Sequence, residues 1–169
     1  MGKGILNYIG LFVLLVFLQL FLFNNIQISG FINPYVYVLF ILLLPYETPG
    51  WALLIIGFFS GLVIDTFMNT YGMHSSATLF MAFMRPHILN LLTDRVDFDN
   101  KGRPSMAVNG VSWFLRYTII LVLAHHLFLF FVEAFSFTNF FLTVLRIILS
   151  TIATTSFIIL GQFFTLRKV

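Results

Sequence analysis

The sequence contains no cysteine, so neither a disulfide nor a thiolate metal site can form. Charged residues make up only 9% of the chain, whereas an average soluble domain carries about 25%. No Walker loop, dinucleotide-binding fingerprint or HExxH motif is present, and the basic residues are too few and too scattered to bind nucleic acid. We therefore predict a protein that is not an enzyme and has neither a cofactor nor a nucleic-acid partner.

Apolar residues are abundant instead. They form 60% of the 169 residues, 23 of which are phenylalanine, and the mean hydropathy is +1.00. So much apolar surface can be accommodated only in contact with lipid, and the length suits one compact bundle. We predict an all-α, polytopic membrane protein with a single transmembrane domain over residues 1–169.

Apolar runs separated by polar turns predict six transmembrane helices. Most runs reach 18 residues or more, which is enough to cross the hydrocarbon core at a rise of about 1.5 Å per residue. The predicted spans cover residues 5–23, 31–45, 51–68, 75–92, 111–135 and 139–166.

The segment 31–45 is short for a span and carries Pro34 and Pro45 near its ends. Its length also fits a re-entrant or interfacial segment. If it crosses, both termini lie on one side with all the loop and tail Lys and Arg residues, as the positive-inside rule requires. That arrangement favours a crossing and places both termini in the cytoplasm.

The run from Gly57 to Asp65 places three notable residues four apart: Gly57, Gly61 and Asp65. On a helix they share one face, and two glycines at this spacing let a second helix backbone approach closely in lipid. A carboxylate inside the bilayer costs roughly 2.5–3.5 kcal/mol on insertion scales, so it needs a partner or a wet cavity. Asp65 is either a polar clamp between helices or a ligand or proton site.

Charged side chains in the later spans offer partners for Asp65. Glu133 and Arg146 lie within about two helical turns of the short link between the last two spans, so they are the easiest ion pair in the chain. Asp65 should lie at a similar depth. We expect an outer-half polar cluster of Asp65, Glu133 and Arg146, with Arg85 reaching toward it from mid-membrane.

Metal sites are not indicated. The stretch 97–102 has the opening of a calcium-binding EF-hand loop, but Lys101 occupies a ligand position and Val108 replaces the bidentate glutamate. His125 and His126 are adjacent, so they point about 100° apart on a helix and lack metal-ligand spacing.

The region from Gly57 onward resembles the rod shape-determining protein MreD family. The detailed match covers roughly a fifth of the chain, while size, six spans and cytoplasmic termini also fit that family. The matching features are Gly57-x-x-x-Gly61-x-x-x-Asp65, the turn 69–74 and the helix that contains Arg85-Pro86.

This resemblance implies a multi-pass protein of the bacterial cytoplasmic (inner) membrane that supports cell elongation, peptidoglycan synthesis and cell shape without being an enzyme. Its implied partners are an MreC-like bitopic protein and, through the wider complex, the MreB filament and the peptidoglycan synthases. The implied fold is similar to the S component of energy-coupling-factor transporters, which gives a second hypothesis: a small-molecule-binding transporter subunit.

The two hypotheses differ in what they require of the buried charges. A scaffold needs those charges to be mutually paired, whereas an S component needs a roomy pocket facing outward. The outer loops are short and offer little to cover a ligand, which favours the scaffold. We further hypothesise that Asp65 and Arg85 hold the third and fourth spans in the register that partner binding requires.

Overall fold

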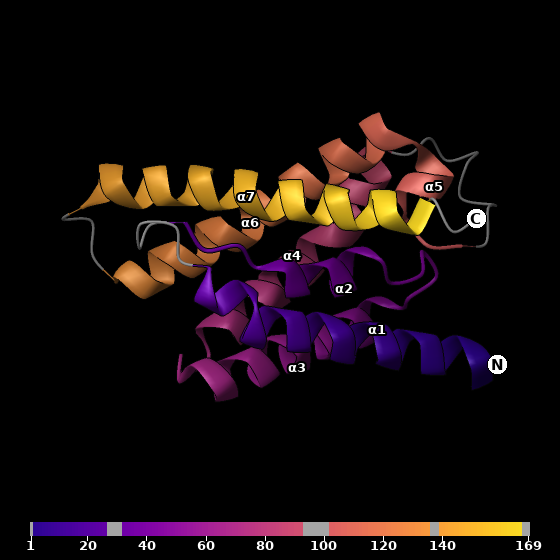
Figure 1. The fold of residues 1–169 in the computed structure, drawn as a ribbon, viewed down its shortest axis with the longest axis horizontal. Helices are drawn as coiled ribbons and strands as arrows, with labels where there is room; N and C mark the ends of the chain where they lie inside the picture. The colour runs from indigo at the N-terminus through magenta and orange to yellow at the C-terminus, as the bar shows by residue number, and fades with distance from the viewer. Residues whose placement is uncertain (1, 27–31, 93–101, 136–138, 167–169) are drawn as a thin grey trace.

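The computed structural model describes the chain except for residues 1, 27–31, 93–101, 136–138 and 167–169. Every regular element in the described part is a helix (Figure 1). The helices are α1 (Gly2–Phe21), η1 (Phe23–Asn25), η2 (Val36–Val38), α2 (Leu39–Leu42), α3 (Gly50–Met68), α4 (Met73–Leu92), α5 (Met106–Asn109), α6 (Val111–Ala134) and α7 (Phe140–Leu166), where η denotes a 3-10 turn.

Among the described residues, four stretches are long and apolar enough to cross a membrane: Ile5–Asn25, Gly50–Met68, Val111–Ala134 and Phe140–Phe164. Large apolar side chains such as Phe17, Phe67 and Phe164 lie exposed on the outside, while polar ones such as Gln19 and Arg85 are buried. A soluble protein has the opposite arrangement. The chain therefore has the character of a helical membrane protein.

Local sequence explains where the long helices begin and end. Pro49 immediately precedes α3 in an extended conformation, and Asn69 ends it in the left-handed conformation, with its N–H donating to the Asp65 carbonyl. Gly110 precedes α6 with φ 79°, and Phe135 ends it with φ 40°. The helices over 50–68, 73–92, 111–134 and 140–166 match the residue ranges of four predicted spans, although 73–92 is not among the stretches apolar enough to cross a membrane.

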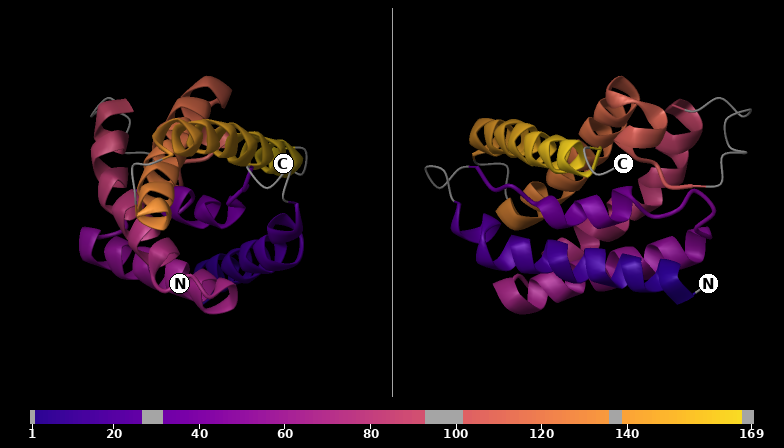
Figure 2. Two further views of the ribbon diagram at one scale, coloured as in Figure 1. Left: turned by 90° about the vertical axis from the view of Figure 1, so that its left-hand side faces the viewer. Right: turned by 45° about the vertical axis from the view of Figure 1, so that its right-hand side comes forward.

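The long helices run roughly along one axis of the bundle, with the first turn of α1 and the last turn of α7 toward the same end (Figures 1 and 2). Extensive contacts join α3 to α4, α4 to α6 and α6 to α7, which makes a continuous series of packed neighbours. α1 contacts mainly η2 and α2, with fewer contacts to α3.

The structure differs from the prediction at residues 32–45, which were expected to form the second of six transmembrane helices. It contains only the 3-10 turn Val36–Val38 and the single α-helical turn Leu39–Leu42, and residues 34–44 are all buried. The two prolines that bound it explain the short helix, because Pro34 and Pro45 both interrupt helical hydrogen bonding. The chain nevertheless passes along the bundle, from the end where α1 finishes to the end where α3 begins (Figures 1 and 2).

The predicted close approach at Gly57 and Gly61 is made by α4. A Cβ atom on Gly57 would lie 2.7 Å from Ala82 Cβ and 3.1 Å from the Thr78 carbonyl oxygen. A Cβ atom on Gly61 would overlap the backbone of His74 and Ser75 at the start of α4. The two glycines therefore let α3 and α4 pack backbone against backbone.

Gly61→Ala should destabilise the protein, because the added methyl group meets backbone atoms that cannot rotate away. Overpacking of this kind costs about 1–3 kcal/mol. The thermal midpoint in nanodiscs should fall by several degrees. Gly10→Ala is the matched control, since no atom lies within 4 Å of its added Cβ. An equal response of the two variants would contradict the close packing.

Candidate functional site

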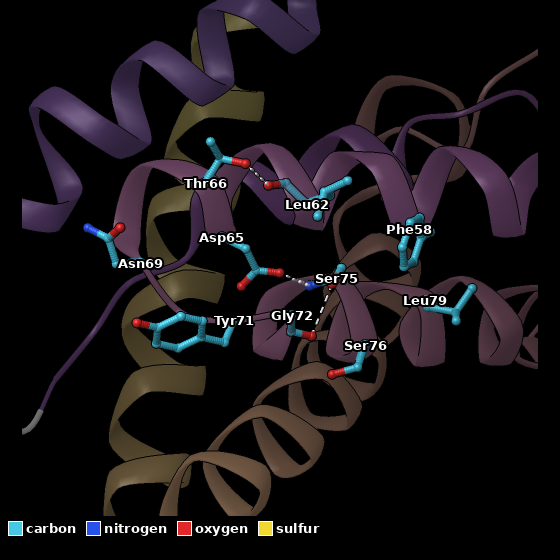
Figure 3. A pocket seen from close by; sticks show the side chains of 10 residues that line it. All are labelled: Phe58, Leu62, Asp65, Thr66, Asn69, Tyr71, Gly72, Ser75, Ser76 and Leu79. Atoms are coloured by element: carbon cyan, nitrogen blue, oxygen red, sulfur yellow. Dashed lines mark hydrogen bonds between the residues drawn. The ribbon is translucent and has the colours of Figure 1, made fainter.

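Asp65 lies in the last turn of α3 and its carboxylate points at the first turn of α4 (Figure 3). Oδ1 accepts hydrogen bonds from Thr70 Oγ1 at 2.5 Å and from the His74 N–H at 2.9 Å, and Oδ2 accepts from the Ser75 N–H at 2.8 Å. The first N–H groups of a helix have no partner within the helix and carry partial positive charge. Asp65 therefore caps α4 from the neighbouring helix.

The α3–α4 turn that Asp65 holds is conformationally unusual. Asn69 and Tyr71 have φ values of 56° and 45°, and Gly72 follows at 90°. Asparagine and glycine accept this left-handed region readily, but a tyrosine there is strained. The side chain of Tyr71 is 95% exposed, so no packing offsets this strain. The hydrogen bonds to Asp65 on both sides of Tyr71 compensate for it.

A hollow of about 580 Å³ opens beside this turn (Figure 3). Asp65 is among its lining residues, but only 5% of Asp65 is exposed, and both carboxylate oxygens already accept hydrogen bonds. The carboxylate is therefore not free to bind a solute. The other lining residues are Phe58, Leu62, Thr66, Asn69, Tyr71, Gly72, Ser75, Ser76 and Leu79.

Arg85 lies inside the bundle on α4 with 1% of its surface exposed. Its Nε donates to Tyr117 Oη at 2.9 Å, its Nη2 donates to the Leu44 carbonyl, and Tyr117 in turn donates to the Leu42 carbonyl at 3.1 Å. Within the described residues Arg85 forms no ion pair. Arg85 thus pairs the Leu44 carbonyl just beyond α2, and it also bonds to Tyr117, which pairs the Leu42 carbonyl at the end of α2.

At the opposite end of the 32–45 segment, side chains of α1 and α7 also form hydrogen bonds with backbone groups. Because this stretch is not a regular helix, its N–H and C=O groups need partners elsewhere. Four hydrogen bonds supply them: Asn33 N to Ser150 Oγ (3.0 Å), Tyr35 N to Thr154 Oγ1 (3.0 Å), Gln19 Nε2 to Pro34 O (3.1 Å) and Tyr37 N to Gln19 Oε1 (3.4 Å). Four of the long helices thus contribute a side chain to this segment.

Just beyond the segment, Tyr46 connects it to Gly102 and to α5 (Met106–Asn109). The Tyr46 N–H donates to the Gly102 carbonyl at 3.2 Å, and its hydroxyl donates to Asn109 Oδ1 at 2.9 Å. Partial burial raises the pKa of Tyr46 above its usual value, so the hydroxyl keeps its proton as a donor.

Glu133 and Arg146 form the ion pair that the sequence suggested, with Nη1 and Oε1 3.0 Å apart. The pair is partly exposed, at 27% for Arg146 and 39% for Glu133. The guanidinium also stacks over Phe130, with Cζ 4.3 Å from the ring centroid. In the amide orientation that satisfies its surroundings, Asn33 accepts from Arg146 Nη2 at 2.8 Å. An exposed ion pair of this kind stabilises a protein by less than about 1 kcal/mol.

The four predicted charges do not form one cluster, and that prediction is wrong. Asp65 bonds to the start of α4, Arg85 bonds to the end of α2, and only Glu133 and Arg146 pair with each other. The prediction assumed that a charge in the membrane needs an opposite charge. Unpaired backbone groups, which composition does not reveal, serve Asp65 and Arg85 instead.

Sequence reasoning missed the residues that serve the broken segment and a buried cluster beside it. Gln19 is a polar residue within the apolar run 5–23, but nothing in the sequence indicates its partner, and Tyr117 carries no signal. Ser150 and Thr154 did carry one, because they follow Arg146 at four-residue steps on α7. The cluster, which joins Tyr37 to His74, Thr78 and His125, draws on three separate parts of the chain.

Comparison with protein-family models, with curated proteins and with solved structures found no match.

Asp65→Ala should destabilise the protein, because it leaves two N–H groups of α4 without acceptors. Loss of a helix cap costs about 0.5–2 kcal/mol. Asp65→Asn should be milder, since the amide oxygen still accepts one hydrogen bond. Thr66→Ala, the exposed neighbour, serves as the control in the same thermal-unfolding measurement. If Asp65→Ala unfolds at the temperature of the control, the capping role is incorrect.

Arg85→Met should lower stability by about 1–3 kcal/mol, because the Leu44 carbonyl and the Tyr117 hydroxyl both lose a buried partner. Arg116→Met is a matched control from the same bundle, since Arg116 is exposed and donates only to the Ser112 carbonyl. The two variants are compared by their thermal unfolding midpoints in nanodiscs. A larger loss for Arg116→Met would refute the structural role of Arg85.

Proposed function

We propose that the chain is a non-enzymatic membrane scaffold of the bacterial cell-elongation machinery, of the MreD kind. The observation that carries this proposal is that the buried charged side chains bond to groups within the protein itself. Asp65 and Arg85 both hydrogen-bond to the chain's own backbone, so neither is left free to bind a solute. Such bonding makes a rigid body, as a platform for other proteins requires.

The topology in this proposal has six crossings in the bacterial cytoplasmic membrane, with both termini in the cytoplasm. The long helices α1, α3, α4, α6 and α7 supply five crossings, and the segment 32–45 supplies the sixth as a broken element. Its passage along the bundle and the side-chain partners of its backbone groups both support that assignment. Non-helical backbone at membrane depth is tolerated when protein surrounds it.

The second candidate is a small-molecule-binding subunit similar to the S component of energy-coupling-factor transporters. The observation in its favour is the hollow of about 580 Å³ beside the α3–α4 turn, at the end that the proposed topology places outside. Against it stands the occupied Asp65 carboxylate. The scaffold is therefore the better-supported proposal.

Affinity purification of the tagged full-length chain from its native cells tests the proposal. We expect an MreC-like bitopic protein to co-purify, and the MreB filament and the peptidoglycan synthases to follow through the wider complex. Asp65→Asn, which keeps one acceptor at α4, should reduce the yield of the bitopic partner, because it loosens the register of α3 and α4. Thr66→Ala should leave the yield unchanged at equal membrane abundance.

The same preparation separates the two candidates. Recovery of wild-type protein without any bitopic partner would reject the scaffold. Mass spectrometry of the purified chain should detect no stoichiometric small molecule. Detection of one would support the transporter subunit instead.

A further inference from the structure

A buried polar cluster inside the bundle, near the start of α4, is not needed for the scaffold. The Tyr37 hydroxyl lies 2.9 Å from Thr78 Oγ1, 2.9 Å from His125 Nε2 and 3.3 Å from His74 Nδ1. These side chains come from the broken segment, α4 and α6, and none is more than 2% exposed. The cluster is thus sealed from both membrane surfaces by the surrounding helices.

Counting protons in this cluster assigns the tautomer of His125. Thr78 donates its hydroxyl proton to the His74 carbonyl at 2.7 Å, so toward Tyr37 it can only accept. Tyr37 therefore donates its single proton to Thr78, and the two imidazole nitrogens that face Tyr37 must both donate. A neutral His125 then carries its proton on Nε2, which leaves a lone pair on Nδ1.

The adjacent residue of α6, His126, has a hydrogen-bond partner at each ring nitrogen and serves as a comparison for His125. His126 Nδ1 donates to the Val122 carbonyl at 2.8 Å, and Nε2 lies 3.3 Å from Thr154 Oγ1, so both ring nitrogens have a partner. His125 is equally buried, but within the described chain its Nδ1 has no hydrogen-bond partner. A buried acceptor without a donor is costly, so nearly all such atoms in proteins are paired.

The surroundings of His125 decide what kind of ligand its Nδ1 accepts. The rings packed around it are those of His74, His126, Tyr35 and Tyr37, with centroids 5.4–6.4 Å away, and none of them offers a carboxylate to a protonated imidazole. Among the described residues, no group of three or more His, Asp or Glu side chains is placed to hold a metal ion. The missing partner is therefore a small neutral hydrogen-bond donor.

We propose that His125 Nδ1 binds a water molecule inside the bundle. Water is the smallest neutral donor, and buried waters characteristically occupy sites beside otherwise unpaired polar atoms. The bound water donates one hydrogen to Nδ1 and makes the Tyr37 cluster a hydrated site inside the bundle. This inference does not depend on the scaffold function.

Nitrogen-15 NMR of histidine-labelled full-length protein in lipid bilayers tests the site. His125 should show a protonated Nε2 and an unprotonated Nδ1 whose signal is shifted upfield from that of a free lone pair, as hydrogen bonding requires. Magnetisation should pass from water to His125 Nδ1 but not to His126 Nε2, whose partner is Thr154. Backbone correlations identify the signals without any variant.

A His125→Gln variant then provides a second measurement, with the exposed His87→Gln as its control. Only His125→Gln should abolish the signal assigned to His125 Nδ1, which receives magnetisation from the bound water. A protonated Nδ1 on His125 would overturn the tautomer assignment. An unprotonated Nδ1 that receives no magnetisation from water, or that contacts an organic ligand instead, would overturn the bound water.

Discussion

Buried backbone N–H and C=O groups must be paired, and the packing around residues 33–44 follows from how the chain meets that requirement. A regular helix would pair these groups internally, but the segment is bounded by two prolines and is helical only at its centre. Side chains of α1, α4, α6 and α7 supply the missing partners. Polar residues that interrupt otherwise apolar helices are therefore structural components of a neighbouring segment.

The buried charges obey the same requirement. An acid and a base at membrane depth suggest mutual neutralisation, yet Asp65 accepts from N–H groups and Arg85 donates to a carbonyl. Both arrangements place a charge against the favourable end of a backbone dipole, and both leave the ion bound inside the protein. The only ion pair within the described residues, Glu133 with Arg146, is partly exposed and contributes less to the fold.

The sequence predicted best those features that depend on residues close together in the chain. The bounds of α3, α4, α6 and α7, the approach at Gly57 and Gly61, and the neighbour relation of Glu133 and Arg146 follow from periodicity, turn residues or short separation. It did worse where the partner is remote. The acceptor for Arg85 is a carbonyl 41 residues away, and the acceptor for the Asn33 N–H is a hydroxyl 117 residues away. The two prolines around residues 35–44 were visible in the sequence, but no residue pattern identifies which remote side chain pairs with a given backbone atom, so these contacts could not be predicted.

The hydrogen bonds from the segment to Ser150 and Thr154 have a consequence for how the protein is made. The ribosome synthesises residues 33 and 35 long before their partners on α7, which follow 117 and 119 positions later. Until α7 enters the bilayer, two backbone donors of the segment have no permanent acceptor. The N-terminal half is thus completed only after α7 has been translated, and a chain that stops before α7 leaves the translocon with two backbone donors of this segment unpaired.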